Sequence, residues 1–399
     1  MSSNVKSKGF LIFMLGLLTS IGPLSIDMYL PSFGSIADSL HTTTSSIALS
    51  LSSFFIGLGV GQLFYGPLLE RYGRVKPTYI GLGIYALSSL GCAYSQSVEM
   101  LIFFRFTQAL GACGGMVASR AIVRDNFKTT EAAKAFSMLM IIVAVSPIIA
   151  PTLGGYISEW TSWRTVFIIL AALSISLWAL LYFFLPKAKP GNPNYSLKLS
   201  SIGKNYAEIL KHPAFILNAL MGSIAYAGLY AYLSGSPHLY IETYGVSETT
   251  YATIFALNAI GLVGAGQINN LILRRVKSRS IVIGALMAQT IVGAVMFTLY
   301  ELDLFTVNTV TACIFSYLFC LGLIFPNASA LSLGSMGHTA GSASAMLGAV
   351  QMLLGAMASA IVSATLSIGF LEMILVMALC AAIALILGMI SQKKLSAFD

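Results

Sequence analysis

The stretch GQLFYGPLLERYGRVKP, residues 61–77, joins two long apolar runs near the start of the chain. Its one acid, Glu70, is followed within six residues by three cations, Arg71, Arg74 and Lys76. The stretch also contains three glycines, which permit close backbone approach between helices or in a tight turn: Gly61, Gly66 and Gly73. A short charged turn between apolar segments indicates a loop that links two membrane spans.

Apolar residues make up 57% of the 399 residues, and charged residues only 9%. A soluble domain carries roughly 25% charged residues, so the solvent for most of these side chains is lipid. The apolar runs are about 20 residues long and show no alternation of period two, which favours helices over barrel strands. The composition therefore predicts an all-α integral membrane protein.

Charged breaks divide the chain into twelve predicted spans: 9–30, 44–66, 77–97, 99–120, 135–157, 163–185, 213–235, 249–271, 279–300, 303–326, 340–366 and 368–390. The longest interruption is rich in Pro, Gly and Lys and predicts a cytoplasmic linker at 187–212. It separates an N-terminal six-helix half, 1–186, from a C-terminal half, 213–399. Two such halves suggest the architecture of secondary transporters, with a site near the middle of the membrane.

Lysine and arginine lie almost entirely on one side of these spans, with 20 of the 22 in loops that share a side with the linker. The opposite loops carry acids and one cation, Arg164, while Arg105 lies inside the fourth span. Since cations mark the cytoplasmic side, both termini are predicted to be cytoplasmic. The net charge of +8 thus indicates membrane orientation and not nucleic-acid binding.

In the stretch 61–77 the chain resembles the major facilitator superfamily, whose signature loop reads roughly G-x-L-x-D-R-x-G-R-[KR]. Glu70 replaces the usual aspartate, and Val75 replaces a usual basic residue. The resemblance implies twelve transmembrane helices in two pseudo-symmetric six-helix halves. It also implies a latch that holds the halves in the outward-open state, with Glu70 facing the start of the eleventh span. The latch residues are Gly66, Glu70, Arg71, Gly73 and Arg74. An ordinary positive cytoplasmic loop is the alternative.

The segment FRFTQALGACGG, residues 104–115, opens the fourth span with Arg105. An arginine inside a bilayer costs at least a few kcal/mol unless it pairs or meets a water-filled cavity. The segment is similar to the superfamily's R-x-x-Q/G motif, which is associated with proton coupling. The alternative is an arginine that extends its side chain to the outer interface.

The segment SPIIAPTLGGYI, residues 146–157, resembles the fifth-span motif of drug/proton antiporters, with Ala150-Pro151 in place of the usual Gly-Pro pair. Two prolines weaken the helix hydrogen bonds, and two glycines permit close packing. The span is therefore predicted to be a bending element, formed by Pro147, Pro151, Gly154 and Gly155.

Several further segments resemble the bicyclomycin-resistance (Bcr/CflA) branch: SIGPLSIDMYLPSF, SGSPHLYIETYG, FALNAIGLVGAGQIN, IFPNASALSL and GSASAMLGAVQMLLGA. The resemblance implies a proton-coupled exporter of small organic molecules, acting by drug/proton antiport in the bacterial inner membrane. Its partners would be a small-molecule substrate, protons and the lipid bilayer. We expect no cofactor, no metal and no nucleic acid, and a monomer.

Other functions remain open at this point. The chain could export one metabolite, such as a siderophore, an amino acid or a dipeptide. Uptake is disfavoured by the antiporter-like fifth span. A sensor would need a soluble domain, which the short tails and linker do not supply. An enzyme is not expected, because the four histidines lie in loops or at span ends and no nucleophile–base pair is evident.

The segment GPLSIDMYLPSF, residues 22–33, raises the question of why the first span carries a carboxylate, Asp27. By helical rise, Asp27 lies roughly 27 Å along its span, and Arg105 roughly 9 Å into the fourth span from the outside. These heights are comparable, and we expect Asp27 to alternate between a proton, Arg105 and substrate. Desolvation raises the pKa of a carboxyl and a nearby guanidinium lowers it, so such a site can take up and release a proton. The alternative is an acid that caps the helix end marked by Tyr29 and Pro31.

Other polar residues are candidates for the same cavity, although helical spacing of this kind more often reflects packing: Tyr29, Gln108, Asn218, Tyr226, Tyr230 and Asn327. Gln108 lies one turn from Arg105, so the two are predicted to share a helix face.

Overall fold

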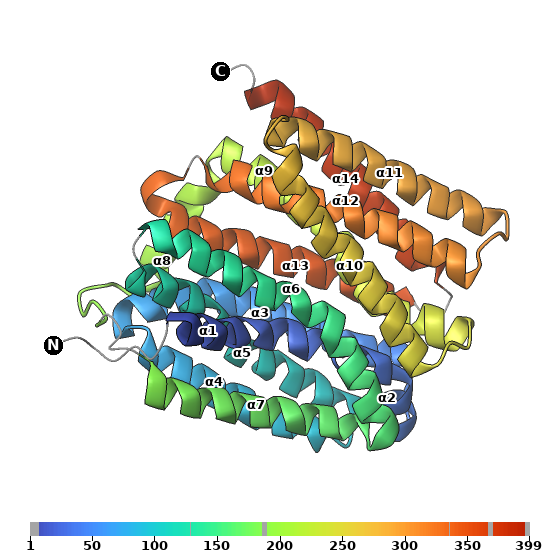
Figure 1. Ribbon diagram of the computed structural model, residues 1–399, viewed down its shortest axis with the longest axis horizontal. Helices are drawn as coiled ribbons and strands as arrows, with labels where there is room; N and C mark the ends of the chain where they lie inside the picture. The colour runs from blue at the N-terminus through green and yellow to red at the C-terminus, as the bar shows by residue number, and fades with distance from the viewer. Residues whose placement is uncertain (1–7, 128, 186–189, 335, 366–369, 396–399) are drawn as a thin grey trace.

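The computed structural model describes residues 8–127, 129–185, 190–334, 336–365 and 370–395. Within these ranges the chain is helical, without strands (Figure 1). The long helices are α1 (Lys8–Asp27), α3 (Thr44–Tyr72), α4 (Val75–Ala93), α5 (Val98–Asn126), α6 (Thr129–Trp160), α7 (Trp163–Phe184), α9 (Pro213–Pro237), α10 (Glu248–Ile272), α11 (Ser278–Glu301), α12 (Val307–Leu333), α13 (Ala340–Thr365) and α14 (Leu371–Leu395). The shorter elements are α2 (Phe33–Ser39), α8 (Leu199–Leu210), η1 (Leu30–Ser32), η2 (His238–Thr243) and η3 (Gly337–Thr339). The predicted all-α membrane fold is confirmed.

Eleven helices of the described chain are long and apolar enough to cross a membrane by length and composition. The twelfth long helix, α4, does not meet this criterion, and its 19 residues include several glycines, serines and a threonine. It corresponds to the third predicted span and packs against α5 and α7. It therefore takes its place in the bundle beside more apolar neighbours.

Hydroxyl side chains fix the start of five helices. The N-cap residues of α3, α5, α7 and α10 each accept a hydrogen bond from a backbone N–H two or three residues later: Thr43, Ser97, Ser162 and Ser247. At α12, Thr306 and Thr309 form a reciprocal capping box. These caps satisfy N–H groups that the first helical turn leaves free. Because successive helices alternate in direction, all five starts lie at one end of the bundle.

The two ends of the bundle differ in charge. We call the end with these caps and α2 the α2 end, and the end that carries α8 and Lys8 the α8 end (Figure 1). Described cations gather at the α8 end, in the turns before α4 and α11, in α8 and in the last turns of α5 and α14. Arg164 lies at the α2 end, as the sequence predicts, while Lys6, Lys128, Lys187 and Lys189 fall outside the described residues.

The helices pack as two sets that meet along two pairs. Helices α1 and α3–α7 pack among themselves, and so do α9–α14. Contacts between the sets run along α3 with α13 and along α6 with α10. Figure 1 shows α6 and α10 close together near the α2 end and farther apart toward the α8 end. The outer surface is strongly apolar, with Leu87 and Phe183 72% and 74% exposed, as expected of side chains that face lipid.

The predicted linker is described from Pro190 onward, and its second part forms the helix α8, which the sequence interpretation did not include. Tyr206 of α8 donates a hydrogen bond of 3.0 Å to the carbonyl oxygen of Leu63 in α3. Ile209 is buried in a small apolar cluster with Phe215. The linker therefore folds onto both sets of helices.

Candidate functional site

A cavity of about 310 Å³ lies between the two sets of helices. Its lining comes from α1, α3, α5 and α6 on one side and from α9, α10, α12 and α13 on the other. Most lining residues are aliphatic or aromatic, and two of those described are charged, Asp27 and Arg120. The volume is at the lower end of the range for pockets that hold drug-sized molecules.

Asp27 is the last residue of α1, and it lines this cavity while being only 5% exposed. The helix stops there because the chain tightens into the 3₁₀ turn of η1, whose second residue is Pro31. Among the described residues its carboxylate forms no ion pair. A carboxylate without a described ion pair in a mostly apolar cavity can bind a proton or a cation.

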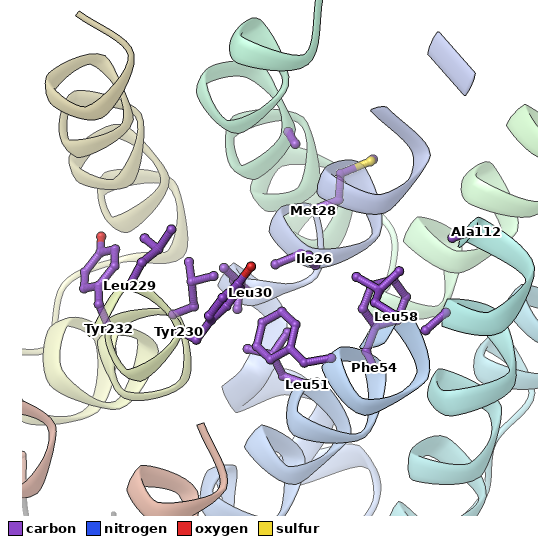
Figure 2. Close-up of a cluster of buried hydrophobic side chains, with 14 of the residues drawn as sticks. Ile26, Met28, Leu30, Leu51, Phe54, Leu58, Ala112, Leu229, Tyr230 and Tyr232 are labelled. Carbon is purple, nitrogen blue, oxygen red and sulfur yellow. The ribbon is translucent and has the colours of Figure 1, made fainter. Parts of the chain in front are cut away.

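Aromatic residues of α9 form one wall of the cavity. The rings of Tyr226 and Tyr230, both predicted cavity residues, lie 5.5 Å apart, and the Tyr226 ring lies 4.6 Å from that of Phe325. The Tyr230 ring also lies 4.4 Å from that of Phe55, across the boundary between the two sets. Figure 2 shows Tyr230 on the side of α9 that faces Ile26 and the helix α3. This wall offers flat apolar faces with hydroxyl groups at their edges.

Arg105 is fully buried inside the first set of helices. Its Cζ atom lies 4.2 Å from the ring centroid of Tyr29 and 4.1 Å from that of Phe54. Its Nη1 donates a hydrogen bond of 2.7 Å to Oε1 of Gln108, while Nε and Nη2 have no hydrogen-bond partner in the described chain. Aromatic faces and one amide hold this charge, and each desolvated cation–π contact is worth about 2 kcal/mol. Tyr29 and Gln108, both predicted for the cavity, belong to this cluster instead.

Asp27 and Arg105 do not form the predicted ion pair in the described structure. The prediction of equal height is wrong. Gly22 lies against Met116, and α1 and α5 run in opposite directions, so Asp27 lies level with Gly111. Arg105 is six residues farther toward the α2 end, or about 9 Å. The chain continues outward from Asp27 through η1 and α2, so Asp27 lies deeper than the end of an apolar run suggests.

Two other predicted cavity residues bond between helices of the second set. Asn218 accepts a hydrogen bond of 3.0 Å from Ser391 of α14. Asn327 donates one of 2.6 Å to the side-chain oxygen of Asn269 in α10. The prediction that Asn218 and Asn327 line the cavity is therefore wrong, since their amides hold neighbouring helices together.

A second cavity of about 390 Å³ lies at the α8 end, between α3, α5 and the start of α13. Glu70 borders it and accepts a hydrogen bond of 3.1 Å from Nη1 of Arg74, and Nη2 of Arg124 lies 3.7 Å away. Nε of Arg74 donates a hydrogen bond of 2.9 Å to Asp125. Glu70 thus faces the eleventh predicted span across a cavity, but its described ion pairs are within the first set. The described residues show no ion pair of Glu70 with the second set, so the latch between the halves stays a prediction.

The linker covers the loop that precedes α4. Nη1 of Arg71 donates a hydrogen bond of 3.1 Å to the carbonyl oxygen of Tyr195. The backbone N–H of Asn192 donates one of 2.8 Å to the carbonyl oxygen of Glu70. The described bond of Arg71 is therefore made to the linker, and a latch role for Arg71 stays a prediction.

The glycines of the signature loop have different roles. Gly73 ends α3 with a φ of +79°, a conformation that other residues rarely adopt. Gly66 was predicted to permit close approach, which is wrong, because a Cβ atom there would meet nothing within 4 Å. The close approach is at Gly61, where a Cβ atom would lie 2.6 Å from Sγ of Cys113 in α5.

The predicted bending element lies in α6, which continues as one helix through Pro147 and Pro151. Pro147 lines the cavity next to α1. A Cβ atom on Gly154 would lie 1.8 Å from the carbonyl oxygen of Met28, whereas on Gly155 its nearest contact would be 3.6 Å away. Gly154 therefore lets α6 touch the backbone just after Asp27, and bending of α6 stays a prediction.

Serine side chains join the two sets toward the α2 end. Oγ of Ser52 in α3 lies 2.7 Å from Oγ of Ser359 in α13, and Ser359 also lies 2.5 Å from Ser234 of α9. Nearer the end of the bundle, Ser45 donates a hydrogen bond to the carbonyl oxygen of Ser363. The sets are thus in contact at the α2 end, while the second cavity separates α13 from α3 and α5 at the α8 end.

Several polar residues of the cavity are not among the predicted site residues, including Arg120, Asn258 and Gln351. Arg120 was counted as a loop cation, because the fourth span was predicted to end there, but α5 continues to Asn126. Asn258 and Gln351 also line the cavity, and Asn258 donates a hydrogen bond of 3.1 Å to Tyr232. Their one signal in the sequence is a polar residue inside an apolar span.

Comparison with known proteins agrees with this architecture. The family model described as Major Facilitator Superfamily matches residues 15–360. The uncharacterized MFS-type transporter YdgK of Bacillus subtilis (strain 168) is 36% identical over 359 residues, which cover 90% of this chain and 89% of the relative. The bicyclomycin resistance protein homolog of Haemophilus influenzae is 27% identical over 96% of each chain. Multidrug resistance protein D of Escherichia coli (strain K12) is 26% identical over 86% of this chain and 85% of the relative.

Two solved structures share the fold. The crystal structure of the D-xylose-proton symporter has a TM-score of 0.76 at 14% identity and covers 95% of this chain and 97% of its own. A bacterial homolog of the human lysosomal transporter Spinster, in an inward-facing and occupied conformation, has a TM-score of 0.71 at 14% identity and covers 98% of each chain. The predicted resemblance to bicyclomycin-resistance transporters is confirmed by the curated relatives, and these two structures support the fold alone.

Proposed function

The chain belongs to the major facilitator superfamily, and from this premise we propose that it is a proton-coupled exporter of small organic molecules, acting by drug/proton antiport. The observation that carries the proposal is Asp27, an acid without a described ion pair in a cavity lined by both sets of helices. Apolar and aromatic walls with few polar groups suit varied organic molecules. Two relatives named for bicyclomycin and multidrug resistance support efflux of drugs.

The difference in charge between the two ends supports one orientation of the protein in the membrane. The cations at the α8 end support a cytoplasmic orientation for that end, and the proposal keeps the expectation that both termini are cytoplasmic. The cavity then opens toward the cytoplasm, because it adjoins the second cavity at Arg120 while serine contacts close the α2 end. One chain contains the whole cavity, which supports a monomeric transporter in the inner membrane.

Asp27 couples the export of substrate to the entry of a proton, because both bind the same carboxylate. Its ionised form attracts a cationic or hydrogen-bond-donating group of a substrate that arrives from the cytoplasm. After the halves rock to face outside, a proton replaces the substrate on the same carboxylate, and the protonated carrier returns. Since substrate and proton exclude each other at Asp27, the inward proton gradient drives export.

The sequence predicts that Arg105 pairs with Asp27 in alternation with a proton and the substrate, but its contacts favour a different role. Its guanidinium contacts Tyr29, two residues after Asp27, and stays inside the first set of helices. We assign it as a positioning residue that holds the turn after α1 and, through this turn, the carboxylate. The rings of Tyr29 and Phe167, 5.8 Å apart, extend this support to α7.

The proposal is tested with Asp27→Asn in everted membrane vesicles. Vesicles with an acidic lumen and the wild-type protein are expected to accumulate the cationic dye rhodamine 123, whereas the variant accumulates none above background. The matched control is Asp38→Asn, which removes an exposed acid from α2 outside the cavity and leaves accumulation unchanged. Accumulation by Asp27→Asn at the wild-type rate would contradict the coupling role.

A further inference from the structure

Arg120 lies six residues, or about one and two-thirds turns, before the end of α5 at Asn126, and its side chain borders both cavities. It is exposed, although it lies between the helix sets and not on the outer surface. We call the cavity that contains Asp27 the inner cavity. Because Arg120 lies where the two cavities meet, a molecule that enters the inner cavity from the α8 end passes this guanidinium.

The described cations around Arg120 have acidic partners, but no described acid forms an ion pair with Arg120. In the second cavity, Arg74 is bonded to Glu70 and Asp125, and Arg124 lies 3.7 Å from Glu70. Among the described side chains, Arg120 forms no ion pair or hydrogen bond. An arginine without an acidic partner at the entrance of a cavity attracts an anion, and its planar guanidinium matches a carboxylate with two parallel hydrogen bonds.

Arg120 and Asp27 stand at opposite ends of the inner cavity. Gly22 of α1 lies against Met116 of α5, so these two residues are at the same height along the bundle. Asp27 is five residues from Gly22 toward the α2 end, and Arg120 is four residues from Met116 toward the α8 end. The two backbones are therefore separated by about 13 Å along the helix axes. Part of this distance is spanned by the side chains, and the remainder matches the length of a small aromatic molecule.

From this geometry we propose that Arg120 is an anion subsite, which selects substrates that carry a carboxylate at one end. The inference rests on the proposed export function and names its substrate class. The carboxylate binds Arg120 at the cytoplasmic side, the apolar body lies against Tyr226 and Tyr230, and an amine or hydroxyl group reaches Asp27. Zwitterionic aromatic molecules fit all three parts.

The alternative is that Arg120 is only an orienting cation at the cytoplasmic end of α5. Arg124 already serves this role one turn later, where it neighbours Glu70 and borders the second cavity but not the cavity that contains Asp27. The two arginines share one helix and one charge but differ in access to the inner cavity. Arg124 is therefore the matched control for Arg120.

The test uses two dyes that differ in one group. Rhodamine 110 carries a free carboxylate, and rhodamine 123 is its methyl ester. Binding of each dye to the purified protein in detergent is measured by fluorescence anisotropy. We expect the wild type to bind rhodamine 110 about tenfold more tightly, since hydrogen bonds to charged groups have this size. Arg120→Gln loses the preference, Arg120→Lys keeps part of it, and Arg124→Gln keeps all of it.

Each outcome decides the inference. Equal binding of the two dyes by the wild type would overturn it without any variant, which removes dependence on how the variants fold. A preference for rhodamine 110 that survives in Arg120→Gln would also overturn it. A preference that is lost equally in Arg124→Gln would overturn it as well, because the combined positive charge around the second cavity would then be responsible. Failure of the proposed function looks different: vesicles would accumulate neither dye under a proton gradient, whatever the ratio of binding constants.

Discussion

The guanidinium of Arg105 lies 4.2 Å from the ring of Tyr29, and in the described structure it forms no ion pair with Asp27, two residues before that tyrosine. A buried arginine and a buried aspartate on neighbouring helices are thus kept apart. The aspartate faces the cavity between the sets, and the arginine faces the interior of one set. In the proposed function, Arg105 positions the carboxylate through Tyr29, which lies in the turn just after Asp27.

The stability of the protein and the pH dependence of transport should depend on the planar shape of the Arg105 guanidinium as well as on its charge. In Arg105→Lys the charge remains, but the planar group that stacks on Tyr29 and Phe54 and bonds Gln108 is lost. We expect a loss of roughly 2 kcal/mol in stability, and a shifted pH dependence of dye accumulation because the turn that carries Asp27 is no longer fixed. Thermal unfolding and vesicle accumulation over a series of pH values measure the two effects.

The control for this prediction is Arg164→Lys. Arg164 also stacks on an aromatic ring, with Cζ 4.3 Å from the centroid of Trp163, but at the α2 end and outside the cavity. Arg164 also donates hydrogen bonds of 2.9 Å to Oγ of Ser39 and of 3.4 Å to the carbonyl oxygen of Ser95. The change there should cost roughly 1 kcal/mol and leave the pH dependence unaltered. An unaltered pH profile in Arg105→Lys would show that charge alone suffices and would remove the positioning role.

Two adjacent glycines of α6 should respond differently to one methyl group. Gly154→Ala places a Cβ atom 1.8 Å from the backbone oxygen of Met28, so α6 and the turn after Asp27 must separate. We expect a loss of 1–3 kcal/mol, or about the cost of overpacking a core. Gly155→Ala meets nothing closer than 3.6 Å and should be neutral or slightly stabilising. Equal melting temperatures for the two variants would refute the close contact.

Hydropathy and charge predicted the spans and their alternation because the solvent acts on every residue of a span at once. The ends were harder to predict. Asp27 ends α1 three residues before the apolar run does, because η1 and α2 continue in the same direction. The helix α8 was missed because a short helix in a polar linker is held by contacts such as Tyr206 with Leu63, which the sequence does not show.

The facing of polar residues could be predicted only in part. Asn218 and Tyr226 are eight residues apart, which is a rotation of about 80° around the helix. That angle is enough to turn Asn218 toward Ser391 of α14 and leave Tyr226 in the cavity. The neighbouring helices determine which of these two faces lines the cavity. The sequence of one helix does not show where its neighbours lie.

The docking of α8 should be insensitive to pH over the physiological range. Tyr206→Phe removes the hydrogen bond to Leu63 and should cost about 1 kcal/mol. Burial raises the pKa of Tyr206 from 10.0 to about 12. A raised pKa means that the contribution is complete below pH 10.0 and lost as the pH rises through about 12. Thermal unfolding at neutral and mildly alkaline pH should therefore show the same difference.

The control is Tyr195→Phe, because the described contact of Tyr195 with Arg71 uses its backbone oxygen and not its hydroxyl group. This variant should unfold like the wild type at both pH values. A destabilisation by Tyr206→Phe that disappears at mildly alkaline pH would show that the hydroxyl has already ionised and that burial does not protect it.

Closing the α2 end permanently should stop transport. Ser52 and Ser359 approach within 2.7 Å across the two sets, so Ser52→Cys with Ser359→Cys can form a disulfide that joins α3 to α13. Antiport needs this end to open outward, since the substrate leaves there and the proton enters there. Oxidation should therefore abolish dye accumulation, and a reducing agent should restore it. The native cysteines are buried or half-buried, which limits competing reactions.

Each single cysteine variant serves as a control, because oxidation cannot join the two sets when one thiol is missing. Both should accumulate dye normally before and after oxidation, and mass spectrometry of the digested double variant should identify the cross-linked peptides. Full accumulation by protein that is cross-linked throughout would mean that the α2 end need not open between α3 and α13. Export would then require another route past the aromatic wall of α9, and the alternation of access around Asp27 would be wrong.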